Sequence, residues 1–281
     1  MRQIAIYGKG GIGKSLIASH LSFAWAKRGL RVLQIGCDPK QDSTRLLLKK
    51  RKLSSILDLI KDKGFYTENI ALRQAIYESH LLQSGQGKIF CAESGGPEPG
   101  IGCAGKGIAE AIEALNRFDI FRKLNLDAVI YDVLGDVVCG GFSLPIREGY
   151  AQETYIITSG EFEALFAACN IAKVIARFAP RSGARLGGII GNLRGIKSEK
   201  ETIKKFAQLL QAKVVGFIPH SKTIKECSFR GETLFQFVPH SEECAALANI
   251  ADKIWEQKRL SVPRTLDTEK LYKWWSGLSH G

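Results

Sequence analysis

One stretch near the N-terminus has the residue types and the spacing of a phosphate-binding loop. It fits G-x-x-x-x-G-K-[ST] and reads Gly8, Lys9, Gly10, Gly11, Ile12, Gly13, Lys14 and Ser15. The glycines let backbone N–H groups surround a β-phosphate, while Lys14 supplies positive charge to the β- and γ-phosphates. The Ser15 hydroxyl is expected to bind Mg²⁺ at the start of the following helix. All eight residues are therefore predicted to bind ATP, and Lys14 also to take part in its hydrolysis.

Acidic side chains follow two further apolar, strand-like runs. Asp132 begins D-x-x-G with Gly135, an arrangement in which the carboxylate senses Mg²⁺ and the γ-phosphate. Asp38 and Asp42 follow the other run and would form a second switch, with Asp38 near Mg²⁺. Lys40, between them, is assigned to nucleotide binding together with Asp42. An alternative role for Asp42 is to cap the turn that follows it.

Two of the seven cysteines end glycine-rich loops, and these are Cys103 and Cys139. Taken alone, each is either a metal ligand or a small buried hydrophobic residue. A [4Fe–4S] cluster needs four thiolates, and the chain has no C-x-x-C pair, so cluster binding would require two loops from each of two copies. Four other cysteines are expected to be buried without a metal role: Cys91, Cys169, Cys227 and Cys244.

Apolar runs rich in β-formers alternate with segments of helical period, which predicts an α/β fold with a mostly parallel sheet and helices on both faces. The expected strands are 3–7, 32–35, 88–91, 128–132, 154–158, 186–190 and 213–217. The expected helices are 14–28, 108–116, 162–177 and 200–210. Parallel strands bring the loops described above to one edge of the sheet. We predict a single P-loop NTPase domain over residues 1–258 and a C-terminal tail over 259–281, which packs along the body or on a partner subunit.

Composition narrows the class of protein further. The 281 residues are 45% hydrophobic and 24% charged, which is typical of a folded globular chain. No apolar run is long enough for a membrane span and no signal-peptide pattern is present, so we expect a cytoplasmic protein with reduced thiols and no membrane partner. The net charge is +12, but the basic residues are dispersed. The densest run, 49–52, has no interleaved aromatic residue, so no nucleic-acid partner is expected.

A second lysine in the phosphate loop, Lys9, introduces a family resemblance. GKGGxGKS resembles the deviant Walker A loop of the SIMIBI-type group, which includes the nitrogenase iron protein, the Min and Par partitioning ATPases and the arsenite-pump ATPase. In that group the extra lysine reaches the nucleotide of the opposite subunit. The resemblance therefore implies a catalytic role for Lys9 across a homodimer.

Three stretches, 35–45, 93–107 and 131–142, resemble the nitrogenase iron protein family, which includes ATP-dependent reductases of tetrapyrrole synthesis. The resemblance covers about residues 1 to 255. It implies one [4Fe–4S] cluster per homodimer held by Cys103 and Cys139, with Cys37 outside the ligand set. It also implies that Asp136 positions the attacking water and that Asn192 contacts adenine. The implied partners are a larger nitrogenase-like catalytic component and a ferredoxin or flavodoxin as the electron source.

Other functions remain open at this point. A partitioning or positioning ATPase without a cluster explains the phosphate loop and Lys9, and an iron–sulfur carrier or assembly ATPase is a further alternative. Lys106 stands where nitrogenase iron proteins carry an arginine that is ADP-ribosylated in some of them, so regulation by that route is not implied here. The sequence names neither the substrate of the catalytic partner nor the electron donor.

Overall fold

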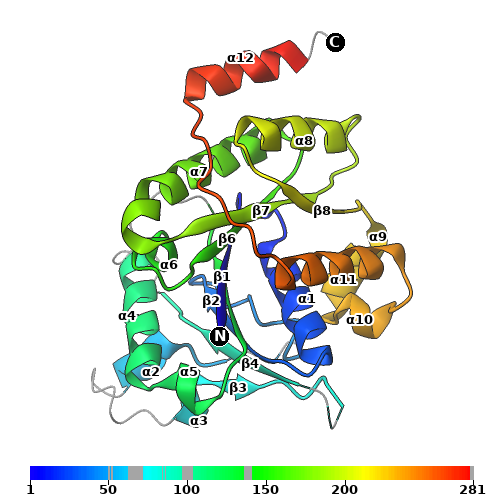
Figure 1. Cartoon of the computed structure of the whole chain (residues 1–281). Helices are drawn as coiled ribbons and strands as arrows, with labels where there is room; N and C mark the ends of the chain where they lie inside the picture. The colour runs from blue at the N-terminus through cyan, green and yellow to red at the C-terminus, as the bar shows by residue number, and fades with distance from the viewer. Residues whose placement is uncertain are drawn as a thin grey trace.

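A sheet of eight strands forms the middle layer of the molecule in this computed structural model (Figure 1). The structure describes residues 1–49, 51, 53–62, 72–83, 85, 87–96, 104–135 and 141–278. Within these residues the strands are β1 Arg2–Tyr7, β2 Arg31–Cys37, β3 Tyr77–Glu78, β4 Lys88–Glu93, β5 Ala128–Val133, β6 Glu153–Thr158, β7 Arg185–Asn192 and β8 Val214–Ile218. Their order is β3-β4-β2-β5-β1-β6-β7-β8, and only β3 is antiparallel to its neighbour.

Both faces of the sheet are buried, and β1 shows how the sequence specifies this. Ile4 and Ile6 belong to one hydrophobic core, whereas Ala5 and Tyr7 belong to the other. All four side chains are fully buried. Because successive side chains of a strand point to opposite faces, a continuous apolar run produces a strand that must be covered on both sides.

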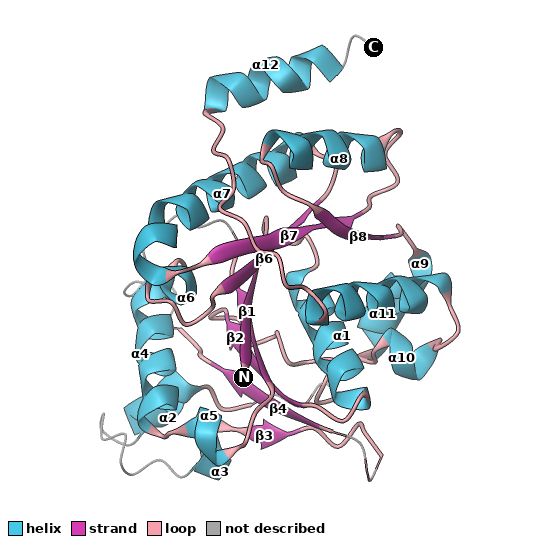
Figure 2. Ribbon diagram, viewed as in Figure 1, coloured by secondary structure: helices cyan, strands magenta, loops and turns pink. Residues whose placement is uncertain are grey.

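Helices supply that cover on each face (Figure 2). One core is closed by α1 Lys14–Lys27, α9 Lys222–Arg230, α10 Leu234–Phe237 and α11 Glu242–Trp255. The other is closed by α2 Ile56–Asp62, α3 Leu72–Ala75, α4 Ala104–Arg117, α5 Ile120–Lys123, α6 Leu144–Arg147, α7 Phe162–Ser182, α8 Glu199–Leu209 and α12 Thr268–Leu278. The result is the three-layer arrangement that the alternation of strand and helix patterns predicts.

The strand order changes direction at β1, which lies between β5 and β6. The chain passes from β1 to β2 and β4 on one side of the sheet, returns to β5, and continues with β6 to β8 on the other side. Loops that leave adjacent strands toward opposite faces separate at such a point and leave a crevice at the carboxyl ends of the strands. The phosphate loop follows β1, and Asp132 is near the end of β5, so both lie at this crevice.

The predicted strands match seven of the observed ones, with shifts at their ends. β4 continues two residues past the predicted end because its pairing with β2 extends to Glu93, so Cys91 is inside the strand. Helix α4 begins at Ala104 rather than at residue 108. The two-residue strand β3 was not predicted, since so short a segment carries no periodic pattern.

The C-terminal tail packs along the body of its own chain. Ser261 forms an antiparallel bridge with Leu186 next to the sheet, and the backbone N–H of Arg264 donates to the carbonyl of Leu210. Helix α12 then places aromatic rings against the body, with Tyr272 4.7 Å from Phe162 between ring centroids. The domain boundary at residue 258 stays a prediction. Among the described residues, no helix has both the length and the apolar character needed to cross a membrane.

Candidate functional site

The phosphate loop, residues 8–15, connects β1 to α1 in a conformation that only glycine permits at two positions. Gly8 and Gly13 have positive φ angles of 154° and 103°. A Cβ at Gly8 would lie 2.3 Å from the carbonyl oxygen of Ile157, and one at Gly13 would lie 2.6 Å from Nδ2 of Asn192. The loop is therefore a close-fitting cradle that leads directly into the amino end of α1, where unpaired N–H groups favour an anion.

A cavity of about 390 Å³ opens beside this loop and gathers most of the predicted site residues. The cavity is large enough for a small ligand. It is lined by Gly10, Gly11, Gly13, Lys14, Ser15, Leu16, Asp38, Lys40, Asp42, Asp132, Val133, Leu134 and Ser228. The structure thus brings together the phosphate loop, the β2 aspartates and the β5 aspartate, as the sequence predicts.

Lys14 is buried, and its ammonium group is held within the phosphate loop. Its Nζ donates to the carbonyl oxygens of Gly8 at 2.9 Å and Lys9 at 3.0 Å. The positive charge therefore lies inside the cradle, where the predicted β- and γ-phosphates need it. The Lys9 side chain is half-buried and is not among the described residues that line the cavity. Its predicted role across a subunit boundary stays a prediction.

Asp132 and Ser15 meet at the base of the cavity. The Asp132 carboxylate is almost fully buried and accepts hydrogen bonds from the hydroxyls of Ser15 and Ser43. Burial raises the pKa of Asp132, while these two hydrogen bonds and the charge of Lys14 oppose the rise. Carboxylate and hydroxyl oxygens are the protein ligands that Mg²⁺ accepts. The donor set therefore fits a magnesium ion next to the phosphates.

Asn192 ends β7 and contacts the phosphate loop from outside the cavity. Its Nδ2 donates to the carbonyl oxygen of Ile12 at 2.7 Å. The predicted contact with adenine is untested.

Ser228 of α9 is a cavity residue that the sequence did not indicate, and its Oγ accepts a hydrogen bond from Arg45 at 3.0 Å. A serine in a helix carries no motif, so only the fold reveals this position.

Glu93, the last residue of β4, is a buried carboxyl group that sequence reasoning missed. Its Oε1 accepts from the N–H and the hydroxyl of Thr44, at 2.8 and 2.6 Å. Its Oε2 has no hydrogen-bond partner among the described residues. Burial raises the pKa of Glu93 to about 8, helped by the charges of Asp132 and Asp42. The group joins the loop after β2 to the start of the glycine-rich loop after β4.

Cys103, Cys139 and Asp136 lie outside the residues that the structure describes. The described chain resumes at Ala104 after Cys103 and at Gly141 after Cys139, and the two described segments touch. A Cβ on Gly141 would lie 2.0 Å from the Cα of Gly105, so the two backbones are in direct contact at positions where no side chain fits between them. Each of these glycines is two positions beyond one of the cysteines.

The other five cysteines are buried free thiols. Burial raises the pKa of each of them, so all five are protonated at neutral pH: Cys37, Cys91, Cys169, Cys227 and Cys244. A protonated thiol is a poor metal ligand. Within the described ranges, no group of three or more histidine, cysteine or acidic residues could hold a metal ion.

Two solved structures share the fold of this chain. The cell division ATPase MinD of Pyrococcus furiosus matches with a TM-score of 0.69 and 17% identity, over 92% of this chain and 99% of that one. The septum site-determining protein MinD of Pyrococcus horikoshii, complexed with Mg-ADP, matches with a TM-score of 0.69 and 19% identity, over 91% of this chain and 96% of that one. Likeness at this identity shows the fold alone. The fold and the cavity together define an α/β protein of the P-loop NTPase class.

Sequence comparison then identifies the family. A sequence model of one protein family matches residues 2–278, and the family is described as "4Fe-4S iron sulfur cluster binding proteins, NifH/frxC family". The nitrogenase iron protein of Methanospirillum hungatei is 43% identical over 275 residues, which are 97% of this chain and 94% of that protein. The nitrogenase iron protein 2 of Methanothermobacter thermautotrophicus is 43% identical over 270 residues, which are 96% of each chain. The chain belongs to this family, as the resemblance predicted, and membership confirms the predicted cofactors: a [4Fe–4S] cluster, ATP and Mg²⁺.

Proposed function

We propose that this protein is an ATP-hydrolysing reductase component that passes single electrons to a larger nitrogenase-like catalytic partner. The electron would come from a [4Fe–4S] cluster shared by two copies of the chain, and a ferredoxin or flavodoxin would supply it. Family membership and the names of the relatives support this role. The cytoplasmic location expected from the sequence stays part of the proposal.

The backbone contact between Gly105 and Gly141 is the observation that carries the proposal. It brings together two described glycines, each two positions beyond one of the cysteines in the sequence, although Cys103 and Cys139 are far apart along the chain. Two thiolates are half of the set that a [4Fe–4S] cluster requires. A second copy, related by a twofold axis, would supply the other half. The cluster, when bound, stores and releases one electron.

The stretch after β5 would couple the nucleotide to this cluster site. Asp132 and Leu134 line the cavity, and Gly135 passes over the phosphate loop, with its ideal Cβ position 3.6 Å from the backbone N of Gly10. Cys139 follows only a few residues later. A change at the γ-phosphate that moves this stretch would therefore reach the cysteine.

Hydrolysis would depend on the charged groups around the phosphates. Lys14 would neutralise the β- and γ-phosphates, Asp132 and Asp38 would hold Mg²⁺ together with Ser15, and Asp136 would orient the attacking water. Lys9 would complete the site of the partner subunit.

Cysteine substitutions test the proposal directly. Cys103→Ser and Cys139→Ser are expected to lose the iron and the visible absorption of anaerobically purified protein, while MgATP still binds. Cys244→Ser, at a buried thiol in α11, is the matched control and is expected to keep its iron. Iron analysis, absorption spectra and MgATP titration provide the readouts. Iron content and reductase activity that survive in either Cys103→Ser or Cys139→Ser would contradict the assignment.

The sequence left open a second candidate, an ATPase of the partitioning or positioning kind that carries no cluster; the MinD structures share its fold, and family membership weighs against it. The same purification separates the two candidates. Unmodified protein with a stoichiometric amount of iron, close to four atoms per dimer for one [4Fe–4S] cluster, supports the reductase. Iron-free protein that still hydrolyses ATP supports the alternative.

A further inference from the structure

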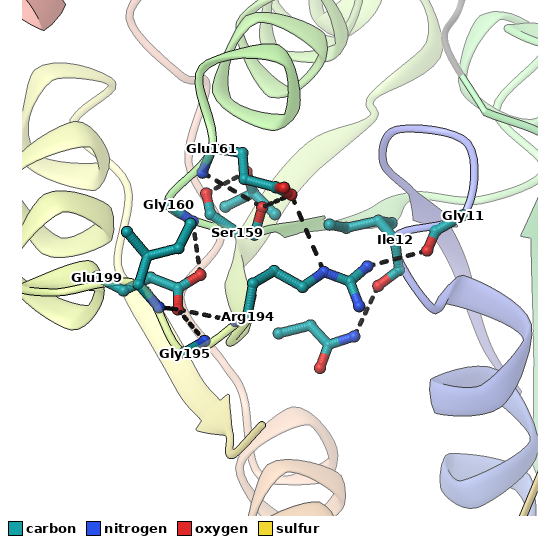
Figure 3. Close-up of polar contacts among 11 residues, drawn as sticks. Gly11, Ile12, Ser159, Gly160, Glu161, Arg194, Gly195 and Glu199 are labelled. Atoms are coloured by element: carbon teal, nitrogen blue, oxygen red, sulfur yellow. Dashed lines mark hydrogen bonds and ion pairs between the residues drawn. The ribbon is translucent and has the colours of Figure 1, made fainter. Parts of the chain in front are cut away.

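A network of polar contacts holds the phosphate loop (Figure 3), and the side chains of Arg194 and Asn192 that make these contacts are not among the residues that line the cavity. The guanidinium group of Arg194, two residues past the end of β7, donates from Nη2 to the carbonyl oxygen of Gly11 at 2.9 Å. Asn192 donates to the next carbonyl, that of Ile12, at 2.7 Å. Two consecutive peptide groups of the loop are therefore fixed from outside by one short segment of chain.

Peptide geometry carries the effect of these contacts into the cavity. In a trans peptide the C=O and N–H groups point in opposite directions, so a carbonyl fixed on one side directs the N–H to the other. The N–H of Ile12 donates to the carbonyl of Lys9 at 3.2 Å, which closes the turn of the loop. The N–H of Gly13 is opposite the carbonyl of Ile12 in the next peptide, and Gly13 lines the cavity. Arg194 thus fixes the peptide whose N–H closes the turn of the loop, and Asn192 fixes the next peptide, whose N–H belongs to Gly13.

Arg194 is itself held in place by two acidic residues. Its Nε lies 4.0 Å from Oε2 of Glu161, a carboxylate that also accepts from the hydroxyl of Ser159 at 2.9 Å. Its backbone N–H donates to Oε2 of Glu199 at 2.8 Å. Glu199 is buried and its Oε1 accepts from the N–H of Gly160 at 2.9 Å. One buried carboxylate therefore joins the loop after β6 to the loop after β7.

We propose that Arg194 is a positioning residue of the nucleotide site, which holds the phosphate loop in its anion-binding shape before the nucleotide arrives. This inference rests on the proposed binding of MgATP. Arg194 contacts the backbone of the phosphate loop and not the base of a nucleotide. Its effect should therefore extend to every ligand that occupies the phosphate cradle. ATP, ADP and inorganic pyrophosphate should all depend on it to the same degree.

The test compares three variants by calorimetric titration with MgATP, MgADP and magnesium pyrophosphate. Arg194→Met keeps the aliphatic stem but removes every donor, and about tenfold weaker binding of all three ligands is expected for the loss of one charge-assisted hydrogen bond. Arg194→Lys keeps one donor that can reach the carbonyl, so it should recover part of the affinity. Lys197→Ala removes an exposed positive charge from the same loop and should bind all three ligands normally.

Three results would overturn the proposal: unchanged affinities in Arg194→Met, an equal loss in Lys197→Ala, or a loss that affects ATP but not pyrophosphate. Thermal unfolding without nucleotide separates positioning from folding, since a positioning role predicts weaker binding at nearly unchanged Tm. If Arg194→Met does not fold, Arg194→Gln is measured in its place, and the same results would support or contradict the proposal. Iron content reports on the reductase assignment independently, so failure of that assignment and failure of this inference are distinguishable.

Discussion

Two buried carboxyl groups on opposite sides of β1 are satisfied very differently. Glu199, on the β6–β7 side, accepts hydrogen bonds from four backbone N–H groups, those of Gly160, Arg194, Gly195 and Ile196. Glu93, on the β2–β4 side, uses one oxygen for Thr44, and its other oxygen has no partner among the described residues. Buried polar groups are normally paired. The loops that Glu199 joins therefore differ from the loops that Glu93 joins in how completely their buried carboxyl group is hydrogen-bonded.

The two carboxyl groups mark where we expect the site to be rigid and where we expect it to rearrange. The loops joined by Glu199 hold the outer side of the phosphate loop in one arrangement. Glu93 instead precedes the glycine-rich stretch that leads to Cys103, and its Oε2 has no hydrogen-bond partner in the described part of the chain. An unsatisfied buried group calls for a physical explanation, and a segment that changes its contacts provides one. We therefore expect the β6–β7 side to act as the fixed support and the β2–β4 side to move.

Removal of the Glu199 carboxylate should cause the largest loss of stability among the substitutions compared at one pH. Glu199→Ala leaves four N–H groups without an acceptor, three of them in one turn, and we expect a loss of about 3 kcal/mol in the free energy of unfolding. Glu201→Ala, at an exposed position of the same helix, is the control and should change stability by less than about 0.5 kcal/mol. Urea unfolding followed by circular dichroism measures both. A loss no larger than that of the control would show that Glu199 is not the support described above.

A methyl group at Gly141 should act on the side that moves. Gly141→Ala introduces an atom only 2.0 Å from the Cα of Gly105, and we expect overpacking to cost about 2 kcal/mol and to reduce the iron content. Gly277→Ala, where nothing lies within 4 Å, is the matched control. Urea unfolding and iron analysis are the measurements. Full stability and full iron in Gly141→Ala would mean that the two segments do not need this contact.

The raised pKa of Glu93 predicts a dependence of stability on pH. Its pKa rises from 4.5 to about 8 in the folded state, so the folded protein binds more protons than the unfolded chain between these values. The free energy of unfolding should therefore fall as pH rises through this window, by up to about 1.4 kcal/mol per pH unit from this group. Glu93→Gln, which resembles the protonated group, should remove that slope. Unfolding titrations of both proteins at several pH values test this, and identical slopes would contradict it.

The smallest expected effect comes from Thr44, which provides both hydrogen bonds to Glu93. Thr44→Val removes the hydroxyl donor but keeps the backbone N–H, and we expect a loss of about 1 kcal/mol in the free energy of unfolding. Thr44→Ser keeps the hydroxyl and should show a smaller loss. Both are measured by urea unfolding. A larger loss in Thr44→Ser than in Thr44→Val would attribute the effect to packing rather than to the hydrogen bond.

Much of the site could be predicted because its motifs are contiguous. The phosphate loop, Asp38 and Asp132 each follow an apolar strand run, and parallel strands bring their carboxyl ends to one edge. Ser228 and Arg194 escaped prediction as site residues because both come from late elements of the chain, Ser228 to line the cavity and Arg194 to contact the phosphate loop. Glu93 stands in a stretch that carries the family resemblance, but its burial and its bond to Thr44 depend on the pairing of β2 with β4.

The sequence by itself determined the phosphate loop, the class of fold and the family, because local spacing and strand periodicity encode them. Only the tertiary structure decided which distant residues support that loop. Arg194 meets Gly11, and Gly105 meets Gly141, because the order of strands in the sheet places their segments side by side. Strand order is a long-range property that no local pattern specifies, and it is this order that turns separate motifs into one site.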